Sequence, residues 1–151
     1  QVDQKLAELG YTLPDAPKPV GAYAPYFVAD KLVFVSGQIC FGPDGLIVGK
    51  VGAAVDLAKA RQAAQLCALN LLTQARAACD GDLDRIKACV KLTGFVNCTP
   101  DFTDQPKVID AASEVMLAVF GESGRHARAA VGAPSLPLGA AVEIDAIFAL
   151  R

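Results

Sequence analysis

Apolar and polar positions recur with two different periods along the chain, and each period predicts one kind of element. Between Asp56 and Cys79, small and apolar residues recur at spacings of three and four, which predicts one long amphipathic helix. A second helix should begin at Pro106 and end at Gly121, because proline suits the first turn of a helix and glycine the position after its last turn. The segment "DQKLAELG" predicts a short helix stopped by Gly10, and the proline-rich "LPDAPKP" cannot continue it.

Extended segments lie between these helices. Residues 26–28 and 32–36 predict two strands joined by a turn at residues 29–31. The run "IKACVKLTGFVN" predicts a third strand, and "ARAAV" and "AAVEIDAIFAL" predict the last two, joined by "GAPSLPLG". The order helix, two strands, helix, strand, helix, two strands predicts an α+β fold in which helices cover one face of a mixed sheet. The other face of that sheet would need a partner.

The chain is expected to form one domain over residues 1–151, with residues 1–19 as a helical extension and connector. Its 151 residues suffice to bury a core. A hydrophobic fraction of 53% and a mean hydropathy of +0.36 are high for a domain of this size. No apolar run approaches the ~20 residues that span a bilayer, so we expect no membrane association. The excess apolar surface instead suggests contacts between subunits.

Charge and the rarer residues exclude several classes of function. The net charge of −2 and the pI near 5.3 provide no basic surface for a phosphate backbone, so nucleic-acid binding is disfavoured. The five cysteines are dispersed without a CxxC pair, which predicts reduced thiols and a cytoplasmic protein. The single histidine, His126, is expected to be an exposed loop residue. Neither a zinc site nor a catalytic triad is predicted, and no metal or cofactor is expected.

Two charged residues interrupt the last two apolar strands. Alternation along a strand places Glu143 on the face opposite to Val142 and Ile144, and places Arg128 on the same face as Ala130. We therefore expect both charges on the uncovered face of the sheet. A guanidinium matches a carboxylate with two parallel donors, and a nearby glutamate can accept a proton or orient water. The pair predicts a site for a small carboxylated ligand; the alternative is an exposed salt bridge worth ~0.2–1 kcal/mol.

Three segments carry a resemblance to a known family. "GAYAPYFVADKLVFVSGQI", "ARAAVGAPSLPLGAAVEIDAIFAL" and the helix pattern between them resemble the YjgF/Rid family, the reactive intermediate (enamine/imine) deaminases, part of which is also described as endoribonuclease L-PSP-like. The resemblance extends over nearly the whole chain. Arg128 and Glu143 keep the separation of 15 positions found in that family. The segment "KLAELGYTLP" resembles an N-terminal extension of one branch.

The resemblance implies a fold, an assembly and an activity. It implies a chorismate-mutase-like α+β fold, assembled as a homotrimer whose sheets form an inner barrel with active sites between subunits. Arg128 would bind the carboxylate of a 2-imino acid, and Glu143 would position or activate the water that attacks the imine carbon. The products would be a 2-keto acid and ammonia.

Further site residues follow from the same resemblance. Tyr23 matches a tyrosine that lines the cleft in the family, although a hairpin tyrosine also packs at sheet edges. Ser36 and Gly37 match a segment near the ligand, although Gly37 could also serve only to end a strand. Backbone groups around Ala130 would help to hold substrate or water.

The chain also departs from the family at three positions. The family archetype has a cysteine where Ala130 stands and commonly a hydroxyl residue at Ala129. Asp110 replaces an asparagine of the second helix, and its charge would oppose an anionic substrate if it faced the cleft.

Three functions therefore remain open from the sequence. The first is a deaminase of reactive enamine and imine intermediates that needs no cofactor. The second is a noncatalytic trimeric protein whose Arg128 binds a 2-keto acid or a similar metabolite. The third is an endoribonuclease or translation inhibitor, against which the acidic balance and the single histidine argue.

Overall fold

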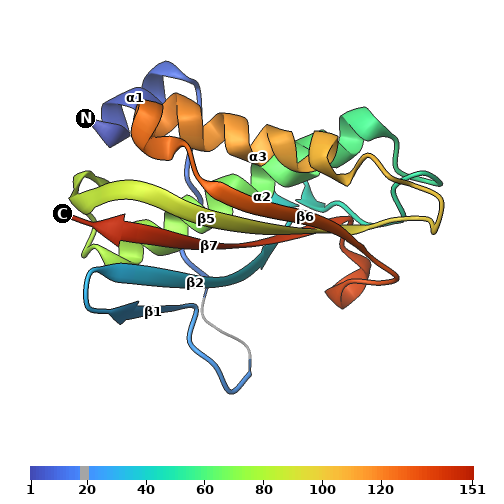
Figure 1. The fold of residues 1–151 in the computed structure, drawn as a ribbon, viewed down its shortest axis with the longest axis horizontal. Coiled ribbons are helices and arrows are strands. Elements are labelled where there is room, and N and C mark those ends of the chain that lie inside the picture. The colour runs from blue at the N-terminus through green and yellow to red at the C-terminus, as the bar shows by residue number, and fades with distance from the viewer. Residues whose placement is uncertain (18–20) are drawn as a thin grey trace.

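A five-stranded sheet organises the fold of the computed structural model, which describes residues 1–17 and 21–151 (Figure 1). Its strand order is β1-β2-β7-β5-β6, and only the β5–β6 pair is parallel. The strands are β1 (Tyr26–Ala29), β2 (Leu32–Ile39), β5 (Ile86–Asn97), β6 (Ala127–Ala133) and β7 (Val142–Leu150). A small hairpin of β3 (Phe41–Gly42) and β4 (Gly45–Leu46) follows β2. The predicted strands are thus all present, and β2 and β6 extend further than the sequence indicates.

Two helices, α2 (Leu57–Ala78) and α3 (Gln105–Phe120), cover one face of this sheet (Figure 1). The Asp56 side chain caps α2 by accepting a hydrogen bond from the Lys59 backbone N–H at 2.8 Å. Pro106 lies in the first turn of α3, and Gly121 follows its last residue with φ 64°. Both helices were predicted, and the mixed α+β arrangement is confirmed. Within the part of the chain that the structure describes, no helix is long and apolar enough to cross a membrane.

The core lies between the helices and the sheet. The row Val142, Ile144, Ala146 and Phe148 of β7 is at most 2% exposed, as the alternation along this strand predicts. Leu71 of α2 and Ile109 of α3 are fully buried above it. Each such side chain contributes roughly 1.5–3 kcal/mol by leaving water.

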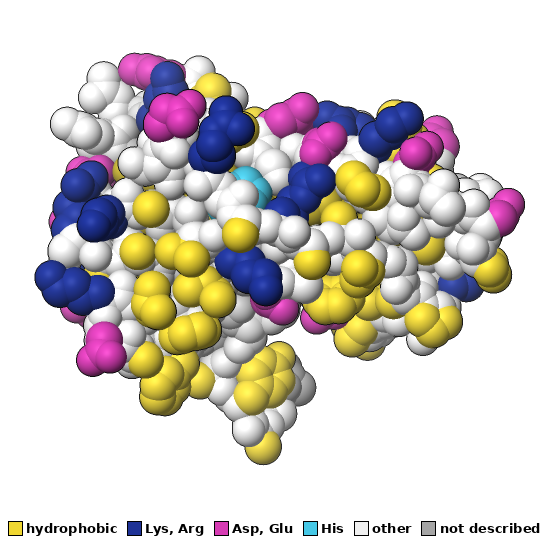
Figure 2. Space-filling view, viewed as in Figure 1, with side chains coloured by type: hydrophobic (Ala, Val, Ile, Leu, Met, Phe, Trp, Pro, Cys, Tyr) yellow, Lys and Arg dark blue, Asp and Glu magenta, His cyan; other side chains and the backbone are white. Residues whose placement is uncertain are grey.

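None of the described residues forms a layer over the opposite face of the sheet. Phe27 and Phe34 are partners across β1 and β2, and they are 67% and 40% exposed. Val131 of β6 is 45% exposed on the same face. Figure 2 shows apolar side chains gathered over the strands at the lower left of the molecule. This exposed apolar face fits the prediction that one side of the sheet needs a partner.

The N-terminal segment packs on the helical layer. Helix α1 (Val2–Glu8) buries Val2 and Leu6 and lies beside α3, and the backbone N–H of Val2 donates to Asp84 Oδ1 at 2.9 Å. The connector of residues 9–17 then meets α2 through hydrogen bonds to Tyr11 and Pro14. Residues 18 and 19 of the predicted connector lie outside the described residues.

Gly94 sets how closely α3 approaches the sheet. A Cβ at this position of β5 would lie 2.5 Å from Cδ1 and 2.6 Å from Cγ1 of the fully buried Ile109. We expect Gly94→Ala to lower the free energy of unfolding by about 1–3 kcal/mol, because Ile109 or α3 must move. Urea unfolding at one protein concentration measures the change. Ala58→Ser, at an exposed position of α2, is the control; equal midpoints for the two variants would contradict this account of the packing.

Candidate functional site

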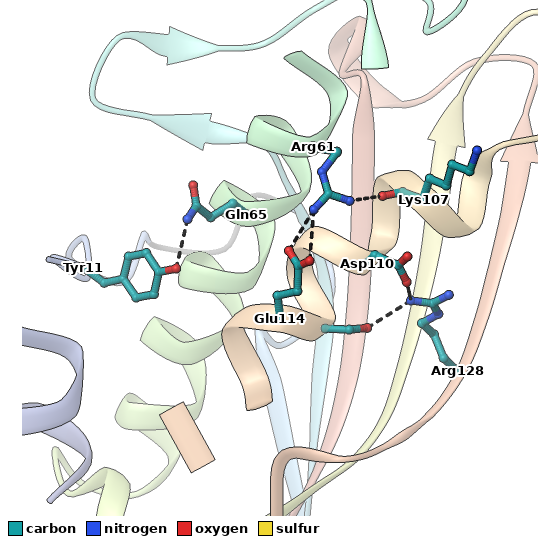
Figure 3. A network of polar contacts seen from close by, with 8 residues as sticks. Tyr11, Arg61, Gln65, Lys107, Asp110, Glu114 and Arg128 are labelled. Atoms are coloured by element: carbon teal, nitrogen blue, oxygen red, sulfur yellow. Dashed lines mark hydrogen bonds and ion pairs between the residues drawn. The ribbon is translucent and has the colours of Figure 1, made fainter. Parts of the chain in front are cut away.

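Arg128 lies on the helix-covered face of the sheet. Its Nη1 donates to Asp110 Oδ1 at 2.7 Å and to Ser113 Oγ at 3.1 Å, and both partners belong to α3 (Figure 3). The parallel register pairs Arg128 with Leu92, which is fully buried beneath the helices. The prediction that Arg128 shares the uncovered face with Glu143 is therefore wrong. Alternation along β6 sets which residues share a face, but the register with β5 decides which face that is.

A chain of hydrogen bonds continues from Arg128 to the histidine. Ser113 Oγ lies 2.8 Å from His126 Nε2, and His126 Nδ1 lies 2.6 Å from the Gly124 carbonyl oxygen. Since a carbonyl can only accept, Nδ1 donates to it, and Nε2 forms a hydrogen bond with the Ser113 hydroxyl. That hydroxyl in turn accepts from Arg128. His126 is half-buried and holds the hydroxyl of Ser113, to which Arg128 donates. The sequence instead predicts an exposed loop residue at this position.

Asp110 and Ala130 accompany Arg128. The Asp110 side chain is 50% exposed, the Arg128 side chain is 23% exposed, and the two form an ion pair. The negative charge of Asp110 is therefore engaged by Arg128. Ala130 is half-buried against the core and is the register partner of Gly94. We call Asp110, Ser113, His126, Arg128 and Ala130 the arginine cluster.

Glu143 lies on the other face, as alternation along β7 predicts. Its register partners are Ile39 of β2 and Phe95 of β5. Burial, and secondly the neighbouring charge of Asp145, raise the pKa of the Glu143 carboxyl above its ordinary value. This carboxyl is therefore a stronger base than an exposed glutamate.

Gly37 makes room for the Glu143 carboxylate. The register of β2 against β7 shifts between Val35 and Gln38, which is the irregular stretch that contains Gly37. A Cβ at Gly37 would collide with the Glu143 carboxylate. The glycine thus allows the carboxylate to lie directly over the β2 backbone, so it does more than end a strand.

Ser36 holds the loop that carries Tyr23. Its hydroxyl donates to the Ala24 carbonyl at 2.6 Å, and its backbone N–H donates to the Pro25 carbonyl at 3.0 Å. Tyr23 is 59% exposed and lines the same cavity as Gly37 and Glu143. The predicted residues Tyr23, Ser36, Gly37 and Glu143 therefore belong together, and we call them the glutamate cluster.

The cavity beside Glu143 has a volume of about 1110 Å³. The N-terminal connector, α2, the end of β2 and the segment around Leu138 form its walls. Glu143 and Asp15 bring acidic groups to it, and none of its described lining residues is Lys or Arg. One chain therefore presents a carboxylate in a cavity at the end of β2 and a guanidinium on β6 at the opposite edge of the sheet, and it does not bring the two clusters together.

Sequence comparison identifies the family. Residues 3–149 match the family described as "YjgF/chorismate_mutase-like, putative endoribonuclease". The chain belongs to the YjgF family. The resemblance inferred from the quoted motifs and the YjgF-like fold are confirmed.

Three proteins are similar to this chain over at least 90% of both lengths. Protein TCP17 of Trypanosoma cruzi is 45% identical over 153 residues, which cover 100% of this chain and 95% of that protein. The RutC family protein y4sK of Sinorhizobium fredii is 34% identical over 136 residues, covering 90% and 93%. The crystal structure of Atu1372 from Agrobacterium tumefaciens, a protein of unknown function, superposes with a TM-score of 0.93 at 46% identity, covering 99% and 92%. The whole architecture, extension included, thus recurs in a solved structure.

The electrostatic setting of Glu143 can be tested by carbon-detected NMR titration. We expect its pKa to lie above that of exposed glutamates and to fall in Asp145→Asn, because this substitution removes the neighbouring negative charge. Asp101→Asn, in an exposed loop, should leave it unchanged. Because folding raises the pKa of Glu143, the folded state binds this proton more tightly than the unfolded state does. The stabilisation that results is lost as the pH rises through the folded-state pKa. An unchanged Glu143 midpoint in Asp145→Asn would contradict the coupling.

Proposed function

We propose that this protein is a hydrolytic deaminase of 2-imino acids that works as a homotrimer. In this proposal Arg128 of one copy and Glu143 of the next copy form each site. The observation that carries it is the separation of the two groups within one chain. Glu143 occupies a cavity whose described lining has no cation, while the guanidinium of Arg128 is oriented on β6 at the other edge of the sheet. Arg128 supplies the cation that the cavity of Glu143 lacks.

The shape of the sheet supports this assembly. Its uncovered face carries exposed phenylalanine and valine side chains, which a neighbouring copy would bury. β6 forms one edge of the sheet, and the end of β2 projects beyond the shorter β1 at the other edge. If three sheets closed into a barrel, the β6 edge of one copy would face the β2 edge of the next. Arg128 would then approach the cavity that contains Glu143 and Gly37.

Arg128 is suited to bind the substrate carboxylate. Its Nη1 is engaged with Asp110 and Ser113, which fixes the plane of the guanidinium. The remaining guanidinium donors can form two parallel hydrogen bonds with one carboxylate. A preoriented donor also loses less side-chain entropy on binding than a free one.

Glu143 is suited to activate water. In the proposed step its carboxylate takes a proton from water while the water oxygen bonds to C2 of the protonated imine, and the C=N electron pair moves to nitrogen. Glu143 returns the proton to the amino nitrogen of the resulting carbinolamine, so the C–N bond breaks as the C=O bond forms. The hydroxyl proton leaves with ammonia as ammonium, which gives the 2-keto acid and restores the carboxylate. Water is the only co-reactant because no atom changes its redox state. A carboxyl with a raised pKa makes a more effective base near neutral pH.

A noncatalytic metabolite-binding protein is the second candidate. Ala129 and Ala130 place neither a hydroxyl nor a thiol on β6 beside Arg128, where the resemblance implies such groups. The site could then bind a 2-keto acid without turning over an imine. An endoribonuclease is less well supported, because the only histidine is engaged with Ser113 and the net charge is −2.

The decisive measurement is the release of keto acid from freshly generated 2-imino acids. We expect acceleration by the wild type and its loss in Arg128→Ala, together with the binding of small 2-keto acids. Glu143→Gln should retain that binding and lose at least ~100-fold in turnover, as expected when a general base is removed. Arg61→Ala, which removes another arginine paired with α3, is the control and should stay active. A wild type no faster than the uncatalysed reaction would rule out the deaminase, and Arg128-dependent binding would then favour the second candidate.

Asp110 should compete with the substrate carboxylate for Arg128. We expect Asp110→Asn to bind pyruvate several-fold more tightly, because the exposed ion pair it removes is worth ~0.2–1 kcal/mol. Isothermal titration calorimetry measures the change. Glu114→Gln, one turn along α3 and paired with Arg61, is the matched control and should not alter affinity. Weaker binding by Asp110→Asn would instead mean that the orientation of the guanidinium by Asp110 favours the ligand more than the competing charge opposes it, and it would contradict this prediction.

A further inference from the structure

The cavity beside Glu143 is much larger than a short-chain imino acid requires. Its volume of about 1110 Å³ lies just above the roughly 300–1,000 Å³ of pockets that hold whole drug-sized ligands. An imine carbon placed at Glu143 would leave most of this space empty. The remainder is bounded by α2 and the N-terminal connector.

This part of the cavity has fixed and mainly apolar walls. Leu66 and Leu69 of α2 face Phe41 and residues of the connector. Gln65 Nε2 donates to the Tyr11 hydroxyl at 3.1 Å (Figure 3), and the Thr73 hydroxyl donates to the Pro14 carbonyl at 2.9 Å. The connector is therefore attached to α2 at two points, and the wall is preformed.

Gln74 contributes an unsatisfied polar atom to this wall. Its residue is only 2% exposed, it lines the cavity, and its Oε1 has no hydrogen-bond donor. Asn70, one turn earlier on the same side of α2, is satisfied because its Nδ2 donates to the carbonyls of Ile39 and Phe41. A buried carbonyl without a donor costs free energy. The terminal torsion of glutamine is soft, so a small rotation can present this oxygen to a ligand.

The position of Gln74 sets the length of the ligand. Asn70 contacts Ile39, which is the register partner of Glu143, so Asn70 marks the level of the reacting carbon. Gln74 lies one turn further along α2, which is about 6 Å at a rise of 1.5 Å per residue. That length is comparable to an aromatic side chain that carries a polar group at its far end.

Building on the proposed function, we propose that this space is the side-chain pocket of the enzyme. It accepts 2-imino acids whose large aromatic side chain ends in an O–H or N–H group. The ring packs between Leu66, Leu69 and Tyr11, and the terminal donor bonds to Oε1 of Gln74. A phenol or an indole has this combination of an apolar body and one donor.

Calorimetry with stable 2-keto acids tests the pocket without requiring turnover. The probes are pyruvate, phenylpyruvate and 4-hydroxyphenylpyruvate. We expect affinity to rise in that order, with about a tenfold gain from the hydroxyl group, which one hydrogen bond to a buried acceptor can supply. Gln74→Met should abolish the preference for the hydroxyl and leave phenylpyruvate binding unchanged. Gln62→Met, at an exposed position of α2, is the matched control and should retain the preference.

A second variant keeps the test independent of Gln74. Leu69→Phe fills the cavity, so it should weaken binding of both aromatic keto acids and leave pyruvate unaffected. The pocket assignment is wrong if aromatic keto acids bind no better than pyruvate, or if Gln74→Met keeps the preference for the hydroxyl. In either case the proposed Arg128-dependent hydrolysis of imines would still stand. If the keto acids bind in the expected order but no imine is hydrolysed, the proposed function is wrong and the pocket assignment stands.

Discussion

The one-sided cover of the sheet is the constraint on which the rest of this structure depends. Alternation along β7 sends its apolar row beneath α2 and α3 and leaves Glu143 and Asp145 on the opposite face. No second layer covers that face within the described residues, and its apolar side chains are partly exposed. The Glu143 carboxyl is itself partly buried and lies near the charge of Asp145, which together explain its raised pKa. The fold and the placement of the two charged groups share this single cause.

The sequence predicts the elements better than it predicts the relations between them. The bounds of β5 and α2 follow from local patterns, because β-branched runs, helical spacing and capping residues act within a few positions. The face occupied by Arg128 does not follow, because it depends on the register between β5 and β6, and these strands are connected through α3. A period of two identifies residues that share a face, and only tertiary packing decides which face it is.

The candidate site likewise combines residues that local motifs identify with contacts that only the tertiary structure shows. Arg128, Glu143 and Tyr23 are identifiable from motifs, and the role of Gly37 beside Glu143 agrees with its place in the "SGQI" segment. The links from His126 and Ser113 to Arg128 join residues of α3 and the β6 entry, so no short motif contains them. The unsatisfied amide of Gln74 was also not predicted, because in the sequence it is one polar residue within a helix. Gln74 lines a cavity only because the connector, about sixty positions earlier in the sequence, forms the facing wall.

The attachment of the N-terminal connector has a consequence for how related proteins can diverge. The connector contributes a wall of the large cavity and lies outside the helices and the sheet, with only Tyr11 and Leu13 packed against the core. Substitutions at its exposed positions can reshape the cavity at little cost in folding free energy. Arg128 and Glu143 instead sit on strands, where most changes disturb packing. The protein thus separates its two charged groups, built into the strands of its framework, from a cavity wall that can be remodelled residue by residue.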